Sequence, residues 1–181
     1  GIRFTAEGFY KAYSNYPVSV KNGISLANQG SEFGAVGNED VEGIGKGQTY
    51  GFELFVQQKL VKNIFYVVSY TYVRSLFSGA DGELIPSAWD SQHLLSSTFG
   101  WNFGKNWKLG LKYRFAGGAP YTPFDLEASQ QNYAFFGNGV LDFANVNSRR
   151  LRAFNQLDFR IDKIVNLKKV SFDFYVDIQN I

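Results

Sequence analysis

The chain has no cysteine and no methionine, and it contains only one histidine and four prolines in 181 residues. Without cysteine, these residues can form no disulfide and offer no thiolate as a nucleophile or metal ligand. The single histidine, His93, excludes a cluster of histidine ligands, so a zinc site is not expected. We therefore predict neither a bound metal nor another cofactor.

Long apolar runs and a strong charge of one sign are also lacking. The longest apolar run covers residues 64–68, far short of the roughly 18 residues that indicate a transmembrane helix. A transmembrane β-strand needs only about 9–11 residues with one apolar face, so that class stays open. The net charge of +2 gives no reason to expect a nucleic-acid partner.

Aromatic residues, by contrast, are abundant: 18 Phe and 11 Tyr favour strands over helices. Residues 107–115 show the pattern most clearly, because apolar and polar residues alternate there. The apolar set is Trp107, Leu109, Leu111, Tyr113 and Phe115, and the residues between them are Lys108, Gly110, Lys112 and Arg114. A period of two predicts a β-strand with one apolar and one polar face.

Six further segments show strand-like patterns, and no segment has a helical period. The six are residues 2–13, 48–60, 64–75, 92–103, 154–163 and 170–181. We predict an all-β fold: an antiparallel up-and-down meander of about seven strands, forming a single domain over residues 1–181.

The connections alternate strictly between long and short. Long loops are expected at residues 14–46, 76–90 and 117–152, and tight turns at 61–63, 104–106 and 166–169. In a meander, alternate connections lie at opposite ends of the sheet, so one end carries only turns and the other only loops. Bacterial outer-membrane barrels have this asymmetry, whereas soluble sandwiches turn about every 8–12 residues without such a bias.

Aromatic residues fall near both ends of the apolar faces. Near the turns lie Tyr66, Trp101, Phe103 and Trp107, and near the loops Tyr10, Phe52, Tyr72, Tyr113 and Phe115. Two girdles of aromatic residues, one on each side of an apolar band, are typical of a barrel in a bilayer. Seven strands do not close such a barrel, and the alternation is still running at both ends, so we expect a fragment completed by chain outside it or by other copies.

Several short motifs, in this order, resemble the barrels of TonB-dependent outer-membrane receptors, in particular those from Bacteroidetes. They are residues 50–54 (YGFEL), 69–72 (SYTY), 89–93 (WDSQH), 117–123 (GGAPYTP), and 157–163 (LDFRIDK) followed by 174–180 (FYVDIQN). The resemblance covers the whole chain. It implies a large barrel of the 22-stranded type, of which residues 1–181 would be roughly the last third, without the final strand.

This resemblance implies a Gram-negative outer-membrane location and the active import of a nutrient such as a siderophore, glycan or peptide. The partners implied are the lipid bilayer, the transported molecule, a surface lipoprotein, and the TonB complex, which would bind through an N-terminal region absent from these residues. The plug domain would also be absent. Two alternatives remain open: a passive porin-type channel without a plug, and a soluble all-β carbohydrate-binding module.

Two groups of residues are candidates for function. The first is predicted to face the barrel lumen as a polar track and consists of Lys108, Lys112, Arg114, Asp158, Arg160, Asp162, Asp173 and Asp177. We favour a cross-strand ion-pair ladder over a substrate path, because opposite charges fall on neighbouring strands. The second group, Tyr121, Tyr133, Phe135 and Phe136, would either contact ligand at the extracellular mouth or pack within its own loop.

Catalytic motifs are weak, and we do not expect an enzyme. Asp90 and His93 could serve a serine triad, but no Gly-x-Ser-x-Gly elbow exists, so we expect both to fix the junction of loop and strand. Residues 43–47 (GIGKG) lack the ending and the following helix of a phosphate-binding loop. They are interpreted as the flexible stem of a loop.

Overall fold

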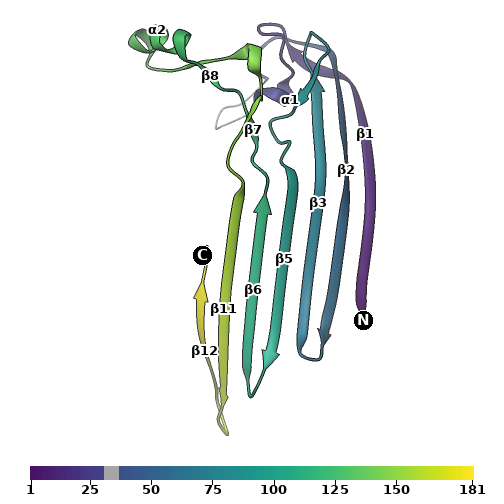
Figure 1. Cartoon of the computed structure of the whole chain (residues 1–181), viewed down its shortest axis with the longest axis vertical. Coiled ribbons are helices and arrows are strands. Elements are labelled where there is room, and N and C mark those ends of the chain that lie inside the picture. The colour runs from purple at the N-terminus through teal and green to yellow at the C-terminus, as the bar shows by residue number, and fades with distance from the viewer. Residues whose placement is uncertain (31–36) are drawn as a thin grey trace.

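The computed structural model describes residues 1–30 and 37–181 and contains one sheet with seven long antiparallel strands (Figure 1). These are β1 (Ile2–Ser19), β2 (Val41–Val61), β3 (Ile64–Ser78), β5 (Gln92–Phe103), β6 (Trp107–Ala116), β11 (Phe154–Asn166) and β12 (Ser171–Ile178). The short strand β4 (Leu84–Pro86) adds to β3. The part of the expected first loop that falls on residues 31–36 lies outside the described residues.

Smaller elements occupy the connections. They are the helices α1 (Leu26–Gln29), α2 (Leu126–Phe136) and η1 (Phe143–Asn145), and the paired short strands β7 (Pro120–Tyr121) with β10 (Arg149–Arg150) and β8 (Phe124–Asp125) with β9 (Val140–Leu141).

The long strands pair in chain order, which confirms the predicted antiparallel meander. Residues at the tight turns adopt positive φ: Lys62 and Asn63 join β2 to β3 at 48° and 67°, and Gly104 and Asn106 lie between β5 and β6 at 54° and 64°. Two consecutive positive φ values match the twist of the flanking strands in a two-residue hairpin. Asn and Gly reach this region at low cost.

The two ends of the sheet differ as the sequence predicted. The turns β2–β3, β5–β6 and β11–β12 lie together at one end, which we name the turn end (Figure 1). The connections β1–β2, β3–β5 and β6–β11, with all the helices, lie at the other, the loop end (Figure 1).

The first two strands are longer than predicted, because β1 continues to Ser19 and β2 begins at Val41. The expected flexible stem at residues 43–47 is therefore wrong, since these residues are part of β2. Gly45 and Gly47 have no side chain, so they interrupt the apolar–polar alternation of β2 in the sequence. Each lies where a side chain would have little room. A Cβ on Gly45 would lie 2.9 Å from the Tyr16 carbonyl oxygen, and one on Gly47 would overlap the Phe77 ring.

Helix α2 was not predicted and lies inside the expected loop at residues 117–152. Its start is capped by Asp125, whose Oδ1 accepts a hydrogen bond from the Ala128 amide at 3.0 Å, and its end by Gly137 at φ 68°. These are ordinary helix-terminating residues. No residue of α2 is buried, so no helical period marks it in the sequence.

Register places the apolar residues of successive strands on the same face of the sheet. Val56 of β2 lies opposite Val68 of β3, and Phe99 of β5 lies opposite Leu111 of β6. Leu111 in turn lies opposite Phe159 of β11. This alternation gives the sheet one apolar face and one polar face, as predicted.

The apolar face has no covering layer in the described residues. Figure 1 shows the long strands as a single layer. Apolar-face residues of the inner strands, such as Phe52 of β2 and Trp101 of β5, are each 41% exposed, while the buried apolar residues all lie at the loop end. These are Val18, Ile24, Ala27 and Phe77. The packed core is therefore confined to the connections, and the strands below it present both faces.

The sheet is open rather than closed into a barrel. Strands β1 and β12 end the pairing order, so each has one edge without a neighbouring strand among the described residues. The backbone amides and carbonyls along such an edge remain available to another strand.

Candidate functional site on the polar face and at the loop end

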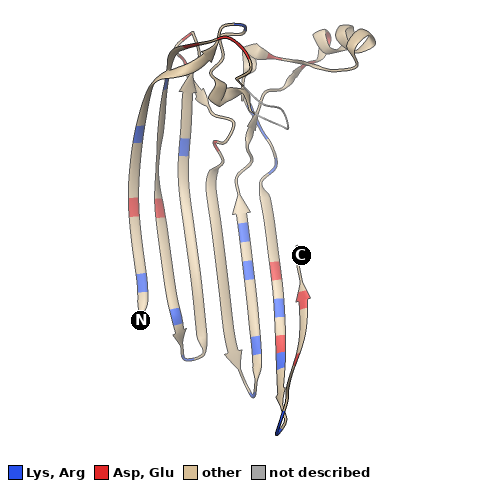
Figure 2. Cartoon of the chain, turned by 180° about the vertical axis from the view of Figure 1, so that it is seen from behind, with Lys and Arg blue, Asp and Glu red and all other residues tan. Residues whose placement is uncertain are grey.

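The eight predicted charged residues lie on β6, β11 and β12, which are neighbours (Figure 2). The register of these strands places all eight on the polar face. We name them the charged rows. The register places Lys108 opposite Asp162 and Lys112 opposite Asp158. Arg160 lies opposite Asp177. The structure thus brings together the whole predicted set.

Arg160 forms the ion pairs of the charged rows. Its Nε and Nη2 donate to Asp162 Oδ1 at 3.0 and 2.7 Å, and its Nη1 lies 3.8 Å from Asp177 Oδ2. The guanidinium also lies 4.1 Å from the centre of the Tyr175 ring. A planar cation held on two sides and over an aromatic face has a fixed orientation.

A second chain of hydrogen bonds links Arg114 to Asp158 through Gln156. Arg114 Nη2 donates to Gln156 Oε1 at 2.7 Å, and Gln156 Nε2 donates to Asp158 Oδ1 at 2.8 Å. Among the described residues, Lys108 and Lys112 form no ion pair, although each lies opposite an aspartate. Of the expected cross-strand ladder, the described residues show the Arg160–Asp177 pair, because Arg160 and Asp162 both lie on β11. Two ammonium groups on the polar face have no direct carboxylate contact in the part of the chain that the structure describes.

Aromatic rings also lie on the polar face, and each of two lies over a glycine of the neighbouring strand. Phe9 is opposite Gly51, and Phe65 is opposite Gly100. A Cβ on Gly100 would overlap the Phe65 ring, and one on Gly51 would come within 2.9 Å of Phe9 Cζ. The missing side chains give the rings room to lie against the sheet, which explains aromatic residues at polar positions.

A shallow hollow of about 300 Å³ lies beside Phe65 on this face. Gly110 lies opposite Gly100 and, like it, contributes no side chain. Lys112 and Arg160 are among the residues lining the hollow. A polar molecule could enter this hollow and contact the charged rows there.

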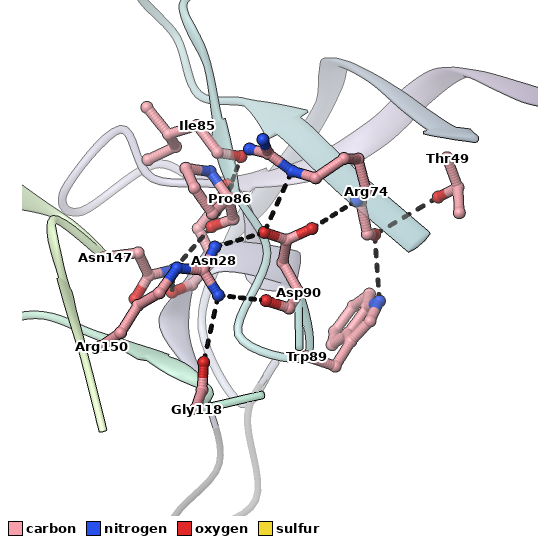
Figure 3. Close-up of polar contacts among 11 residues, drawn as sticks. Asn28, Thr49, Arg74, Ile85, Pro86, Trp89, Asp90, Gly118, Asn147 and Arg150 are labelled. Atoms are coloured by element: carbon pink, nitrogen blue, oxygen red, sulfur yellow. Dashed lines mark hydrogen bonds and ion pairs between the residues drawn. The ribbon is translucent and has the colours of Figure 1, made fainter. Parts of the chain in front are cut away.

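Asp90 centres a buried polar cluster at the loop end (Figure 3). Its side chain is inaccessible to solvent. Its Oδ1 accepts from the Ser75 amide at 2.7 Å, and its Oδ2 lies 3.4 Å from Arg74 Nε and pairs with Arg150 Nη2. Two cations and a backbone donor compensate the buried carboxylate.

Arg150 also binds the backbone of two segments, because its Nη1 donates to the carbonyl oxygens of Asp90 and Gly118. Nearby, Asn147 Nδ2 donates at 2.8 Å to the carbonyls of both Asn28 and Pro86. The cluster therefore ties the α1 segment, the β3–β5 connection and the β6–β11 connection to one another (Figure 3).

Asp90 and His93 do not form a catalytic pair. His93 lies on β5, where its Nδ1 is 2.7 Å from the Tyr70 hydroxyl and its ring stacks with that of Tyr70. The carboxylate of Asp90 is occupied by Ser75, Arg74 and Arg150. Asp90 holds the loop–strand junction, as expected, while His93 contacts the neighbouring strand.

The predicted loop aromatics lie in two places. Tyr121 is in β7 and is 41% exposed, whereas Tyr133, Phe135 and Phe136 lie on α2 and are at least 66% exposed. Helix α2 projects to one side of the loop end (Figure 1). These side chains do not gather around a common cavity with Tyr121.

Glu39 fastens the β1–β2 connection. Its Oε2 accepts from the Ser19 hydroxyl at 2.6 Å, and its Oε1 accepts from Gln29 Nε2 at 3.2 Å. The hydrogen bond from Ser19, followed by that from Gln29, holds the pKa of Glu39 below its ordinary value.

Sequence reasoning identified Asp90 but missed its partners. Arg150 is 60 residues further along the chain, and Asn28 is 119 residues before Asn147. No local spacing connects residues so far apart. The only available signal was compositional: polar residues in otherwise loop-like segments.

The described residues contain no group of three His, Asp or Glu side chains placed to hold a metal ion. None of the helices in residues 1–30 and 37–181 is long and apolar enough to cross a membrane. No protein-family model, curated protein or solved structure matches the chain.

Proposed function

We propose that residues 1–181 form part of the barrel wall of a TonB-dependent outer-membrane receptor that imports a nutrient. In this arrangement the apolar face contacts lipid and the polar face, with its charged rows, lines the lumen. Strands outside these residues would complete the barrel, and a plug and a TonB-binding segment would lie outside them as well.

The observation that carries the proposal is the uncovered apolar face. Fully burying a large apolar side chain is worth about 1.5–3 kcal/mol. A face spanning seven strands and left in water would therefore forfeit more than the roughly 5–15 kcal/mol by which domains are stable. A soluble sandwich would need a second layer, and the described residues supply none.

The distribution of aromatic side chains supports the same environment. Trp101, Phe103 and Trp107 contact one another at the turn end, with ring centres 4.8 and 6.2 Å apart. Phe115 lies at the loop end of β6. Eight residues separate it from Trp107, which is about 27 Å along a strand. At the tilt of about 35–45° that barrel strands adopt, this length rises about 19–22 Å, close to the apolar band about 25 Å tall between two aromatic girdles.

The free edges of β1 and β12 support completion by further strands. In hydrocarbon, unpaired backbone groups cost several kcal/mol each, so a sheet crosses a membrane only as a closed barrel. The 22-stranded size, the plug and the coupling to TonB rest on the resemblance of the motifs.

The test uses the protein expressed from its complete gene in its own cells. We expect it in the outer-membrane fraction, running faster on gels when unheated, as folded barrels do. In planar bilayers the purified protein should show little conductance, because a plug fills the lumen. Uptake of the nutrient that the protein supports should cease when TonB is deleted.

Each alternative gives a different result. A stable open conductance together with TonB-independent uptake would indicate a passive porin-type channel. Recovery of the protein in a soluble fraction would overturn the barrel assignment.

A further inference from the structure

A cleft opens at the loop end, where the α1 segment, the β3–β5 connection and the η1 segment meet. It consists of two hollows of about 410 and 150 Å³. Asn22, Ile24, Phe143 and Val146 line both hollows, so the two adjoin. We name this space the rim cleft; it is separate from the charged rows.

The lining of the rim cleft selects against anions. None of the described residues that line either hollow is a lysine or arginine. Asp81 and Glu83 border the larger hollow, while the smaller one is lined by neutral side chains that include Asn28, Gln29 and Thr122. Amides and a hydroxyl offer both donors and acceptors, which suits an uncharged molecule rich in hydroxyl groups.

Asn28 borders the smaller hollow, and its side chain is held by hydrogen bonds from one end only. Its Nδ2 donates to the carbonyls of Ile85 and Pro86 at 3.2 and 2.9 Å. Its Oδ1 is buried and accepts no hydrogen bond from the residues that the structure describes. A buried acceptor without a donor is unfavourable, but this oxygen is closed off from solvent, so a hydroxyl group in the hollow would reach it only after neighbouring side chains moved.

Phe143 gives the cleft an aromatic surface. It is 51% exposed although it lies in a turn fixed by hydrogen bonds. Asp142 Oδ1 accepts from the Ala144 amide at 3.1 Å, and Asp142 Oδ2 accepts from Asn145 Nδ2 at 2.8 Å. Because these hydrogen bonds fix the backbone that carries the ring, a ligand that packs on Phe143 need not order the turn.

We propose that the rim cleft binds a neutral oligosaccharide. A sugar ring has one apolar C–H face, which would pack on Phe143, and a rim of hydroxyls, which would bond the amides of Asn22 and Gln29. The proposal rests on the proposed function in one respect, because it identifies the imported nutrient as a glycan.

The experiment is titration calorimetry on the complete protein purified in detergent. The probes are neutral oligosaccharides from starch, cellulose, mannan and xylan, with oligogalacturonate as an anionic probe and trilysine as a cationic peptide. We expect at least one neutral probe to bind saturably and Phe143→Ala to weaken it by about tenfold or more. Leu126→Ala, which truncates a 75% exposed apolar side chain of the same connection outside the cleft, should leave binding unchanged.

Three results would overturn the proposal: no binding of any neutral probe, binding of oligogalacturonate or trilysine alone, or equal affinity in Phe143→Ala. Unchanged gel mobility of the unheated Phe143→Ala variant checks that it folds. The proposed function fails separately: a protein that binds glycan but is not in the outer membrane loses only the receptor assignment. A TonB-dependent receptor that binds no glycan loses only the assignment of the cleft.

Discussion

At the scale of single residues, glycine decides where aromatic rings can lie on the polar face. Phe65 rests where Gly100 lacks a side chain, whereas the space above Gly110 holds no ring. The two glycines lie opposite each other on β5 and β6 and differ mainly in this contact. They therefore form a matched pair for testing what the contact contributes.

We expect Gly100→Ala to destabilise the folded protein by about 1–3 kcal/mol, because the new methyl group displaces the Phe65 ring. Gly110→Ala should be nearly neutral, since the nearest atom to its added Cβ is the Arg160 Cβ at 3.8 Å. Urea unfolding in detergent micelles measures both. Combining Gly100→Ala with Phe65→Ala should recover part of the loss. Equal stability of the two single variants would contradict the assigned contact.

Asp90 carries a second prediction at this scale. Asp90→Asn removes the charge that compensates Arg74 and Arg150, so we expect a loss of about 2–4 kcal/mol, somewhat below the usual figure for breaking a fully buried pair because both arginines are partly exposed. Limited proteolysis should then cut within the β6–β11 connection sooner. Asp81→Asn, in the same β3–β5 connection, should change neither measurement. Unaltered cleavage in Asp90→Asn would show that the cluster does not hold the loops.

The contact of Glu39 predicts a dependence on pH. A carboxyl whose pKa is lowered by folding stabilises the folded loop above its ordinary pKa, about 4.3 for glutamate, and loses that contribution as the pH falls through the lowered value. Hydrogen exchange of residues 20–30 should therefore accelerate in this acidic range. In Glu39→Gln, exchange should be independent of pH there after correction for intrinsic rates. The same acid response in both variants would assign it to another group.

At the scale of elements, the long strands could be predicted because their alternation extends over many residues and nothing interrupts it. The predicted start of β2 was wrong because glycines interrupt the alternation of side chains at residues 43–47. Helix α2 was missed for a different reason: it buries no face, so its sequence carries no helical period. The placement of the charged rows on neighbouring strands could be predicted from the order of the strands. The ion pairs of Arg160 could not, because they depend on side-chain conformations that residue spacing does not determine.

The environments of the two faces of the sheet can be tested with one substitution on each face. Leu111→Arg places a cation on the apolar face of β6 and should cost about 2–4 kcal/mol if the site is near the middle of the bilayer. Ser69→Arg places the same side chain on the polar face of β3, near Glu53 and Arg114 in register, and should assemble normally. The fraction of protein that resists unfolding on unheated gels measures both. Normal assembly of Leu111→Arg would remove the lipid contact assigned to that face.

At the scale of the whole molecule, the proposed barrel would take its orientation in the membrane from the difference between the two ends of the sheet. Loops are long and packed at one end, and turns are short at the other. In outer-membrane barrels the long loops face the exterior and the short turns the periplasm. The rim cleft and α2 would then lie outside the cell, and the turn between β11 and β12 would lie inside.

Because residues 1–181 contain no cysteine, a single cysteine introduced there can report this orientation once any cysteine elsewhere in the complete protein has been replaced by serine. On intact cells, a membrane-impermeant maleimide should label Phe135→Cys, on the 83% exposed side chain of α2, and should not label Lys168→Cys in the β11–β12 turn. After the outer membrane is permeabilised, both should react, which excludes the possibility that the turn is simply unreactive. Labelling of Lys168→Cys alone on intact cells would invert the orientation. Equal labelling of the two positions before permeabilisation would mean that no membrane separates the ends, and the barrel proposal would fail with it.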